Sequence, residues 1–167
     1  MLKGWTLALL TLLVGVVGLA QSVDELVAQA QDLLPSRYLP ENLRLAVDLL
    51  ERALALAPER MDLMTLLTRL HYELGIITEE LEAKRREFRR GADLGFAALG
   101  LGSLAEAEDT PKEEFIAQIN RVEDVAALYW TAKCWGMLVD TGGMMAQLNA
   151  IFTGMPAKIR ALYLRAI

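Results

Sequence analysis

The chain has 167 residues, of which 54% are hydrophobic, and its formal net charge is -5 at pH 7. This length predicts one domain, and the apolar content is enough to form a core. The acidic balance and the lack of a basic stripe argue against a nucleic-acid-binding protein. A single cysteine excludes an internal disulfide and a cysteine-based zinc site.

The N-terminus has the pattern of a secretory signal peptide. Lys3 precedes an uninterrupted apolar run over residues 6–19, and residues 18–20 resemble a cleavage site of small residues. The run is short for a transmembrane helix, although an uncleaved anchor is the alternative. We therefore expect a protein that is periplasmic or secreted after cleavage near Ala20, with a mature domain over residues 21–167. No cysteine follows Ala20, so a lipid anchor at this point is not supported.

Beyond residue 22, apolar residues recur every three or four positions, and no stretch alternates long enough to form a strand. This periodicity predicts an all-α protein. The expected helices span residues 23–34, 41–57, 60–74, 78–99, 111–119, 122–140, 144–152 and 156–167. Capping boxes are expected at Ser22, Thr110 and Asn120, because a glutamate follows each of them three residues later. Gly75 is expected to end a helix.

Residues 46–58 carry a signal of a tetratricopeptide repeat, in which small residues let two helices approach and a proline ends the second helix. The matching positions are Ala46, Leu50, Ala53 and Pro58, followed in register by Leu67, Thr68, His71 and Gly75. Residues 79–95 depart from the pattern, so the repeat is degenerate. We expect a tetratricopeptide-like helical repeat array. Residues 163–167 echo residues 50–54 but stop in mid-helix, which suggests truncation at the C-terminus.

The stretch ALYWTAKCWGMLVD, residues 127–140, is apolar nearly all round a helix. Such a helix is either buried on every side or lines a cavity. Burial in the core is the simpler explanation, since aromatic stripes usually pack inside. The alternative is an apolar ligand pocket, for which tryptophan and methionine give large, adaptable surfaces, while a lysine could meet a carboxylate. The candidate ligand-binding residues are Tyr129, Trp130, Lys133, Cys134, Trp135 and Met137.

Other motifs carry weaker signals. Gly100, Gly102 and Ala105 fit G-x-G-x-x-A, but a helix is expected before them where a dinucleotide site needs a strand, so no cofactor is predicted. Residues 79–90 are dense in charge and predict a solvated helix face with i,i+4 pairs from Glu80 to Lys84 and from Glu82 to Arg86. A docking edge for a partner protein is the alternative for this segment.

No arrangement of catalytic residues stands out, and the sequence does not predict an enzyme. His71 has no companions at metal-ligand spacing, which favours a packing role. Glu106, Glu108 and Asp109 cluster in a predicted loop, but they lack the spacing of a calcium site. Lys133 adjoins Cys134 in sequence, yet neighbours on a helix do not face each other, so it does not activate the thiol.

Taken together, the signal peptide, ERALALAP, REFRRGADLG, LYWTAKCWG and the terminal YLRAI resemble the T component associated with TRAP transporters, the TatT family. The resemblance covers most of residues 21–167, and LYWTAKCWG is its most specific part. It implies an all-helical periplasmic protein, often lipid-anchored and trimeric, that works with the transporter's substrate-binding protein and offers a ligand cleft or pore. The chain departs from the family in having no lipid-attachment cysteine and no further C-terminal repeat.

Two functions are expected on this basis. The first is a periplasmic accessory component of a TRAP-type uptake system, which docks the substrate-binding protein and holds an apolar or amphipathic small molecule. The alternative is a tetratricopeptide-type scaffold for protein interactions without a small-molecule site, in which the aromatic helix is simply part of the core.

Overall fold

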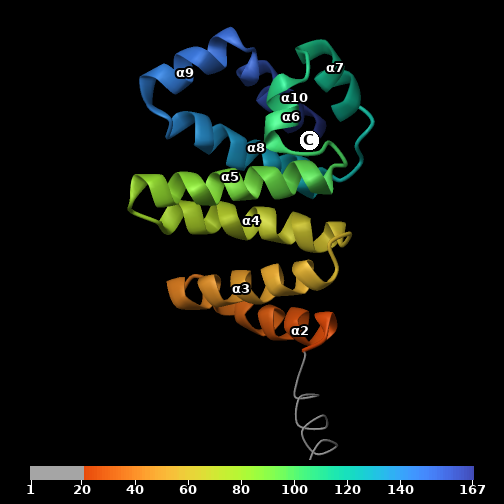
Figure 1. Ribbon diagram of the computed structural model, residues 1–167, viewed down its shortest axis with the longest axis vertical. Helices are drawn as coiled ribbons and strands as arrows, with labels where there is room; N and C mark the ends of the chain where they lie inside the picture. The colour runs from red at the N-terminus through yellow and green to blue at the C-terminus, as the bar shows by residue number, and fades with distance from the viewer. Residues whose placement is uncertain (1–20) are drawn as a thin grey trace, which may run out of the picture.

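The computed structural model describes residues 21–167, so the predicted signal peptide over residues 1–20 lies outside the described residues. Figure 1 shows that the described part is all-helical, as predicted, with no strand in this part of the chain. Its elements are α2 (Val23–Leu33), the 3-10 helix η1 (Leu34–Ser36), α3 (Pro40–Leu56), α4 (Met61–Ile77), α5 (Leu81–Ala98), α6 (Leu104–Asp109), α7 (Lys112–Ile119), α8 (Val125–Asp140), α9 (Gly143–Phe152) and α10 (Met155–Arg165).

The first four helices, α2 to α5, form a stack in which each lies against the next and runs in the opposite direction (Figure 1). Leucines and alanines fill the spaces between them, and each fully buried leucine stabilises the fold by about 1.5–3 kcal/mol. The buried residues of α2, α3 and α4 include Leu26, Ala30, Leu43, Ala46, Leu50, Ala53, Leu63, Leu67 and Leu70. The helical positions of the repeat pattern are therefore buried, whereas Pro58, which follows α3, is exposed.

α8 crosses α5 and α4 at close range. A Cβ atom added to Gly91 of α5 would lie 2.6 Å from Sγ of Cys134, and one added to Gly95 would overlap the Thr131 side chain of α8. Only glycine permits this approach at the two positions. Gly91 and Gly95 therefore allow the close crossing of α5 and α8.

The remaining helices α6, α7, α9 and α10 gather around α8 at the end of the molecule opposite α2 (Figure 1). A buried lysine joins two of them: Nζ of Lys158 in α10 donates hydrogen bonds to the carbonyls of Ala107 at 2.9 Å and Glu108 at 2.8 Å, at the end of α6. Helix ends leave free carbonyls, and Lys158 donates to two of them because α6 has no basic residue in its own last turn. No helix among residues 21–167 has the length and apolarity needed to cross a membrane.

Of the three capping boxes predicted from the sequence, the structure has one. The capping box at Ser22 is confirmed, because its Oγ accepts from the Glu25 amide at 3.2 Å and the Glu25 carboxylate accepts from the Ser22 amide at 2.9 Å. The boxes at Thr110 and Asn120 are wrong, since the Thr110 hydroxyl donates to the carbonyl of Glu106 and α8 has another cap. That cap is Asp124, which accepts from the Ala127 amide at 2.9 Å.

Two further corrections concern α4 and α6. Gly75 does not end α4, which continues to Ile77, and it lies directly against the Phe88 ring instead. The predicted loop with Glu106, Glu108 and Asp109 is the helix α6, which opens with a capping box between Ser103 and Glu106. In residues 21–167 no group of three or more histidine, cysteine or acidic residues is arranged to hold a metal ion.

Candidate functional site

The six candidate residues of α8 divide between two sides of the helix. Cys134 and Trp135 are fully buried, and Met137 packs partly buried against the same core. Tyr129 is 38% exposed, while Trp130 and Lys133 are half-buried. The helix therefore has a core side and an open side, and only the open side is accessible to a ligand.

The core side of α8 is closed by aromatic and small residues. The Trp135 ring lies edge-on to Phe96, at a centroid distance of 5.2 Å, and to Phe115, at 5.8 Å. The Cys134 thiol donates a hydrogen bond to the carbonyl of Thr68, with Sγ 3.4 Å from the oxygen. Burial raises the pKa of this thiol far above its ordinary value, so Cys134 carries no thiolate at neutral pH and is not a nucleophile.

The open side of α8 belongs to a cluster of four aromatic rings, called here the aromatic wall: Tyr72, Tyr129, Trp130 and Tyr163. The Trp130 ring lies 4.9 Å from Tyr129 and 5.6 Å from Tyr72 between centroids, and Tyr129 lies 6.0 Å from Tyr163. These residues come from α4, α8 and α10, which fixes the rings relative to one another. A wall of this kind offers a large apolar surface with hydroxyl groups at its edges.

Two cations lie on the aromatic wall. Nζ of Lys133 is 5.1 Å from the ring centroid of Tyr72 and 5.9 Å from that of Tyr129, while the guanidinium carbon of Arg69 is 5.3 Å from the Trp130 ring. Interaction with Tyr72 raises the pKa of Lys133 despite some opposing desolvation, so its ammonium stays charged. Lys133 makes no ion pair among the described residues, because each pair found there involves another cation. Its charge is thus available to an anion.

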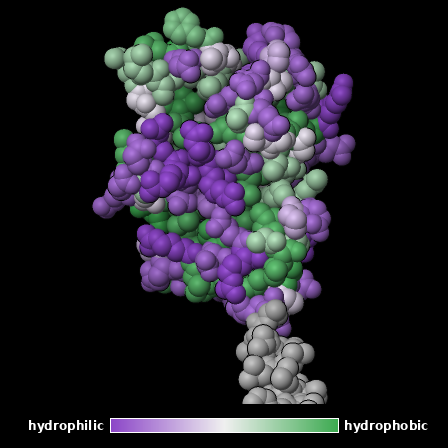
Figure 2. Space-filling view, in the orientation of Figure 1, coloured by the Kyte–Doolittle hydropathy of each residue, from purple (hydrophilic) through white to green (hydrophobic). Residues whose placement is uncertain are grey.

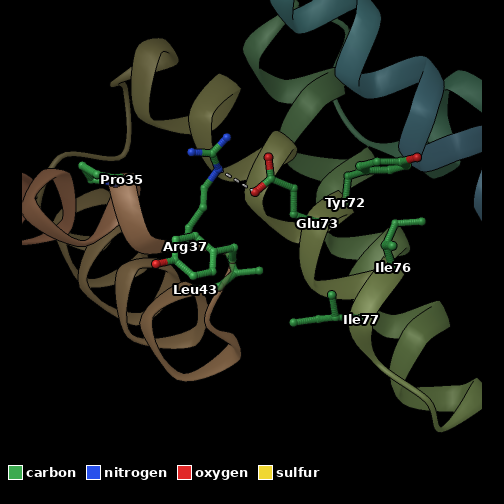
Figure 3. A pocket seen from close by; sticks show the side chains of 8 residues that line it. Pro35, Arg37, Leu43, Tyr72, Glu73, Ile76 and Ile77 are labelled. Atoms are coloured by element: carbon green, nitrogen blue, oxygen red, sulfur yellow. Dashed lines mark hydrogen bonds and ion pairs between the residues drawn. The ribbon is translucent and has the colours of Figure 1, made fainter.

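A groove of about 470 Å³ adjoins the aromatic wall and is called here the α3–α4 groove. Figure 3 shows it between the end of η1 and the beginning of α3 on one side and α4 on the other. Its lining residues are Pro35, Arg37, Tyr38, Leu43, Tyr72, Glu73, Ile76 and Ile77. Ile76 and Ile77 are 48% and 41% exposed, so apolar surface remains uncovered there. Tyr72 belongs to both the groove and the aromatic wall, and the two features are continuous.

An ion-pair triad holds the rim of this groove. Glu73 accepts from Nε of Arg37 at 2.9 Å and from Nε of Arg69 at 2.8 Å, so its carboxylate joins η1 to α4 (Figure 3 draws the first of these contacts). Arg69 also covers Trp130. The triad therefore links the groove rim to the aromatic wall through one side chain. Arg69 and Glu73 are an i,i+4 pair that the sequence displays, but the partnership with Arg37 requires the fold.

His71 of α4 is buried, with 4% of its surface exposed. Its Nδ1 is 2.8 Å from the Glu87 carboxylate and its Nε2 is 3.4 Å from that of Glu51, which also accepts from Arg90 at 3.1 Å. Burial opposes the charged ring, but the two carboxylates together outweigh it and raise the pKa of His71. The adjacent His71 ring, followed by Arg90, lowers the pKa of Glu51 to about 2 against the effect of burial. His71 packs inside, as predicted, although its acidic partners were not anticipated.

The charged segment at the start of α5 is exposed, and Figure 2 shows a hydrophilic band at its level. Its predicted i,i+4 pairs are replaced by other contacts. Glu80 caps α5 by accepting from the amides of Glu82 at 2.8 Å and Ala83 at 2.6 Å, and Arg85 lies 3.4 Å from Glu82. Gly100 and Gly102, at φ +70° and +77°, form the turn that leaves α5, in a region with a helix and not a strand before it.

No family model, curated protein or solved structure matches this chain. Its function is therefore inferred from the geometry of α8 and the α3–α4 groove, together with the resemblance carried by the tryptophan-rich helix.

Proposed function

We propose that the protein is a periplasmic, tetratricopeptide-like binding protein that serves as an accessory component of a TRAP-type uptake system. It holds an amphipathic anion and docks the system's substrate-binding protein. The observation that carries the ligand proposal is Lys133, a cation without an ion-pair partner among the described residues, which lies on an aromatic wall beside an apolar groove. The role is binding and not catalysis.

The ligand would have an apolar tail and an anionic head. The tail lies in the α3–α4 groove, where contact with Leu43, Ile76 and Ile77 removes apolar surface from water at about 25 cal/mol per Å². The head lies at Lys133, where the neighbouring rings exclude water and strengthen the attraction between the charges. The fixed rings keep the ordering cost of binding low.

The tetratricopeptide-like assignment is supported by burial and by the stacking of α2 to α5. Ala46, Leu50, Ala53 and Leu67 are all fully buried, in agreement with a pattern that places them between helices. Stacked helix pairs of this type leave one continuous surface for a partner. We propose that the substrate-binding protein docks on this surface beside the aromatic wall.

Calorimetric titration of the purified protein with decanoate, and with decanol as its uncharged counterpart, tests the ligand proposal. We expect decanoate to bind at least about tenfold more tightly than decanol, and Lys133→Met to remove this difference. Lys84→Met is the matched control, because Lys84 lies on α5 away from the groove and should leave both affinities unchanged. Equal binding of the two probes in the wild-type protein would refute an anionic head at Lys133.

The alternative function is a helical scaffold without a small-molecule site. The burial of Cys134 and Trp135 in the core favours it, since these side chains are explained by packing alone. A protein that binds neither probe, yet binds the substrate-binding protein of a TRAP transporter from the same genome, is this scaffold. Binding of neither the probes nor that partner would reject both functions.

A further inference from the structure

A second crevice, of about 190 Å³, is lined by residues of α5, α6, α8, α9 and α10. Figure 1 shows α9 on the same side of the molecule as the turn between α4 and α5. Arg85 and Arg89 follow that turn on α5. The polar lining residues are Arg85, Arg89, Glu108 and Asn149, and the apolar ones are Leu138, Val139, Ala146 and Met155. None of these residues belongs to the α3–α4 groove or the aromatic wall, so a ligand in this crevice is independent of the proposed function.

One wall of the crevice carries two guanidinium groups with spare donors. Arg85 and Arg89 are four residues apart on α5 and lie on one face of that helix. The one carboxylate close to Arg85 is that of Glu82 at 3.4 Å, and the buried Nε of Arg85 has no hydrogen-bond partner among residues 21–167. Arg89 forms no ion pair in the same part of the chain. Paired guanidinium groups suit a carboxylate, which they bind in a planar, two-point contact.

The lining of the crevice also includes the carboxyl group of Glu108. Glu108 is half-buried, and no described side chain forms an ion pair with it. Lys158 is close, but its Nζ is engaged by the backbone carbonyls of Ala107 and Glu108. The indole nitrogen of the fully buried Trp135 faces Glu108 without reaching hydrogen-bond geometry, and it has no hydrogen-bond partner in the described residues. The crevice thus brings two guanidinium groups and a carboxyl group to one site, and Arg89 acts on the Glu108 carboxyl through its charge without a direct ion pair among residues 21–167.

We propose that this crevice binds a small carboxylic acid with a hydrogen-bond donor on the neighbouring carbon, that is, a 2-amino or 2-hydroxy acid. The carboxylate lies between Arg85 and Arg89, and the amino or hydroxyl group donates to Glu108. The crevice is smaller than the roughly 300 Å³ at which pockets for drug-sized ligands begin, which restricts the ligand to a short side chain. The apolar residues Leu138, Val139 and Met155 receive that side chain.

The ligand would also connect α9 to the rest of the fold. α9 has one buried residue, Ala150, and most of its large side chains are exposed, including Met144, Met145 and Phe152. Figure 2 shows apolar colouring at the upper left, where α9 lies. A helix that buries so little opens readily by local unfolding. A ligand held by Arg85 of α5 and contacting Asn149 of α9 would reduce this opening.

Three probes with one carbon skeleton test the proposal: L-alanine, L-lactate and propionate differ only in the substituent on the second carbon. In titrations of the full chain, we expect at least one of alanine and lactate to bind at least about tenfold more tightly than propionate. The comparison of alanine with lactate identifies whether the donor is an ammonium or a hydroxyl group. The bound ligand is expected to slow hydrogen exchange of the α9 amides severalfold.

Substitutions of the lining residues test which side chains contact the ligand. Arg85→Gln with Arg89→Gln should weaken the preferred probe at least about tenfold, and Glu108→Gln should remove its advantage over propionate. Arg86→Gln is the control, because Arg86 is exposed on the same helix but does not line the crevice, and it should change nothing. Circular dichroism confirms that each variant is folded. Failure of all three probes to bind, or equal affinities that are insensitive to Glu108→Gln, overturns the proposal.

Discussion

The two sides of α8 carry similar aromatic residues, but these residues are packed in the core on one side and half-exposed on the other. On the core side, Trp135 is enclosed by Phe96 and Phe115 and Cys134 lies against Gly91, so every ring and sulfur atom is accounted for by packing. On the open side, Trp130 and Tyr129 form a half-exposed wall with Lys133. The difference shows that aromatic content alone does not indicate a ligand site. What distinguishes the open side is a cation without an ion-pair partner in the described residues, next to uncovered apolar surface.

The largest difference in the free energy of unfolding is expected between variants of the two tryptophans of α8. Trp135→Ala removes a fully buried ring and should lower the free energy of unfolding by about 3–5 kcal/mol. Trp130→Ala removes a half-buried ring and should cost only about 1–2 kcal/mol, while weakening decanoate binding. Urea unfolding of both variants measures the difference. Equal losses of stability would mean that the open side is as much a part of the core as the other.

Substitution of two glycines by alanine should change the stability of the protein in opposite directions. Gly91→Ala places a methyl group against Cys134 and should destabilise the protein by about 1–3 kcal/mol. Gly136→Ala, on α8, meets no atom within 4 Å and should stabilise it by about 0.5–1 kcal/mol, because alanine loses less backbone freedom in a helix. Thermal unfolding reports both signs. Stabilisation by both substitutions would contradict the close crossing of α5 and α8.

Two ionisable groups, His71 and Glu51, are expected to make the stability of the protein depend on pH. Buried His71 has a raised pKa, so it contributes stability that is complete below about pH 6.5 and is lost as the pH rises through its folded value. Glu51, with its pKa lowered to about 2, contributes stability above about pH 4.5 that is lost as the pH falls toward 2. Because the Glu51 side chain is 38% exposed, solvent screening limits its share to about 1–2 kcal/mol. Stability should therefore be greatest between about pH 4.5 and 6.5.

Urea unfolding at a series of pH values measures this pH range of greatest stability. His71→Gln is the control, because this variant should not lose stability on the alkaline side. Lys133, on the open side, has a raised pKa and stays charged well beyond neutral pH, so it adds nothing to that loss. An alkaline loss that persists in His71→Gln would place the responsible group elsewhere.

Much of the helical core could be read from the sequence, but less of the site could. The bounds of α3 and α8 agree with the periodicity to within a few residues, because each helix buries a long apolar stripe. α6 was missed because it has six residues and its stability depends on Lys158, which lies some 50 positions later. Short helices are marginal without tertiary contacts, and periodicity does not detect them.

The candidate site, like α6, could be predicted from the sequence only in part. Tyr129, Trp130 and Lys133 were found because they lie on one unusually aromatic helix. Tyr72 and Tyr163, which complete the wall, lie on α4 and α10 and carry no local signal that relates them to α8. Arg85 and Arg89 have the sequence pattern of ordinary surface charges, since only the fold reveals that they line a crevice together with Glu108. Sequence patterns locate residues along one helix, whereas a binding site is built between helices.

The bond from Lys158 to the end of α6 also affects the order in which the chain acquires its structure. Neighbouring helices in the α2–α5 stack are close in sequence, and contacts of this kind form quickly. α6 obtains its capping donor only after α10 has been synthesised, because Nζ of Lys158 is that donor. On the ribosome, α2 to α5 can thus assemble while α6 to α10 are still incomplete. During that interval the side of α5 that α8 will cover stays exposed, and this is the stage at which the nascent protein most needs protection from aggregation.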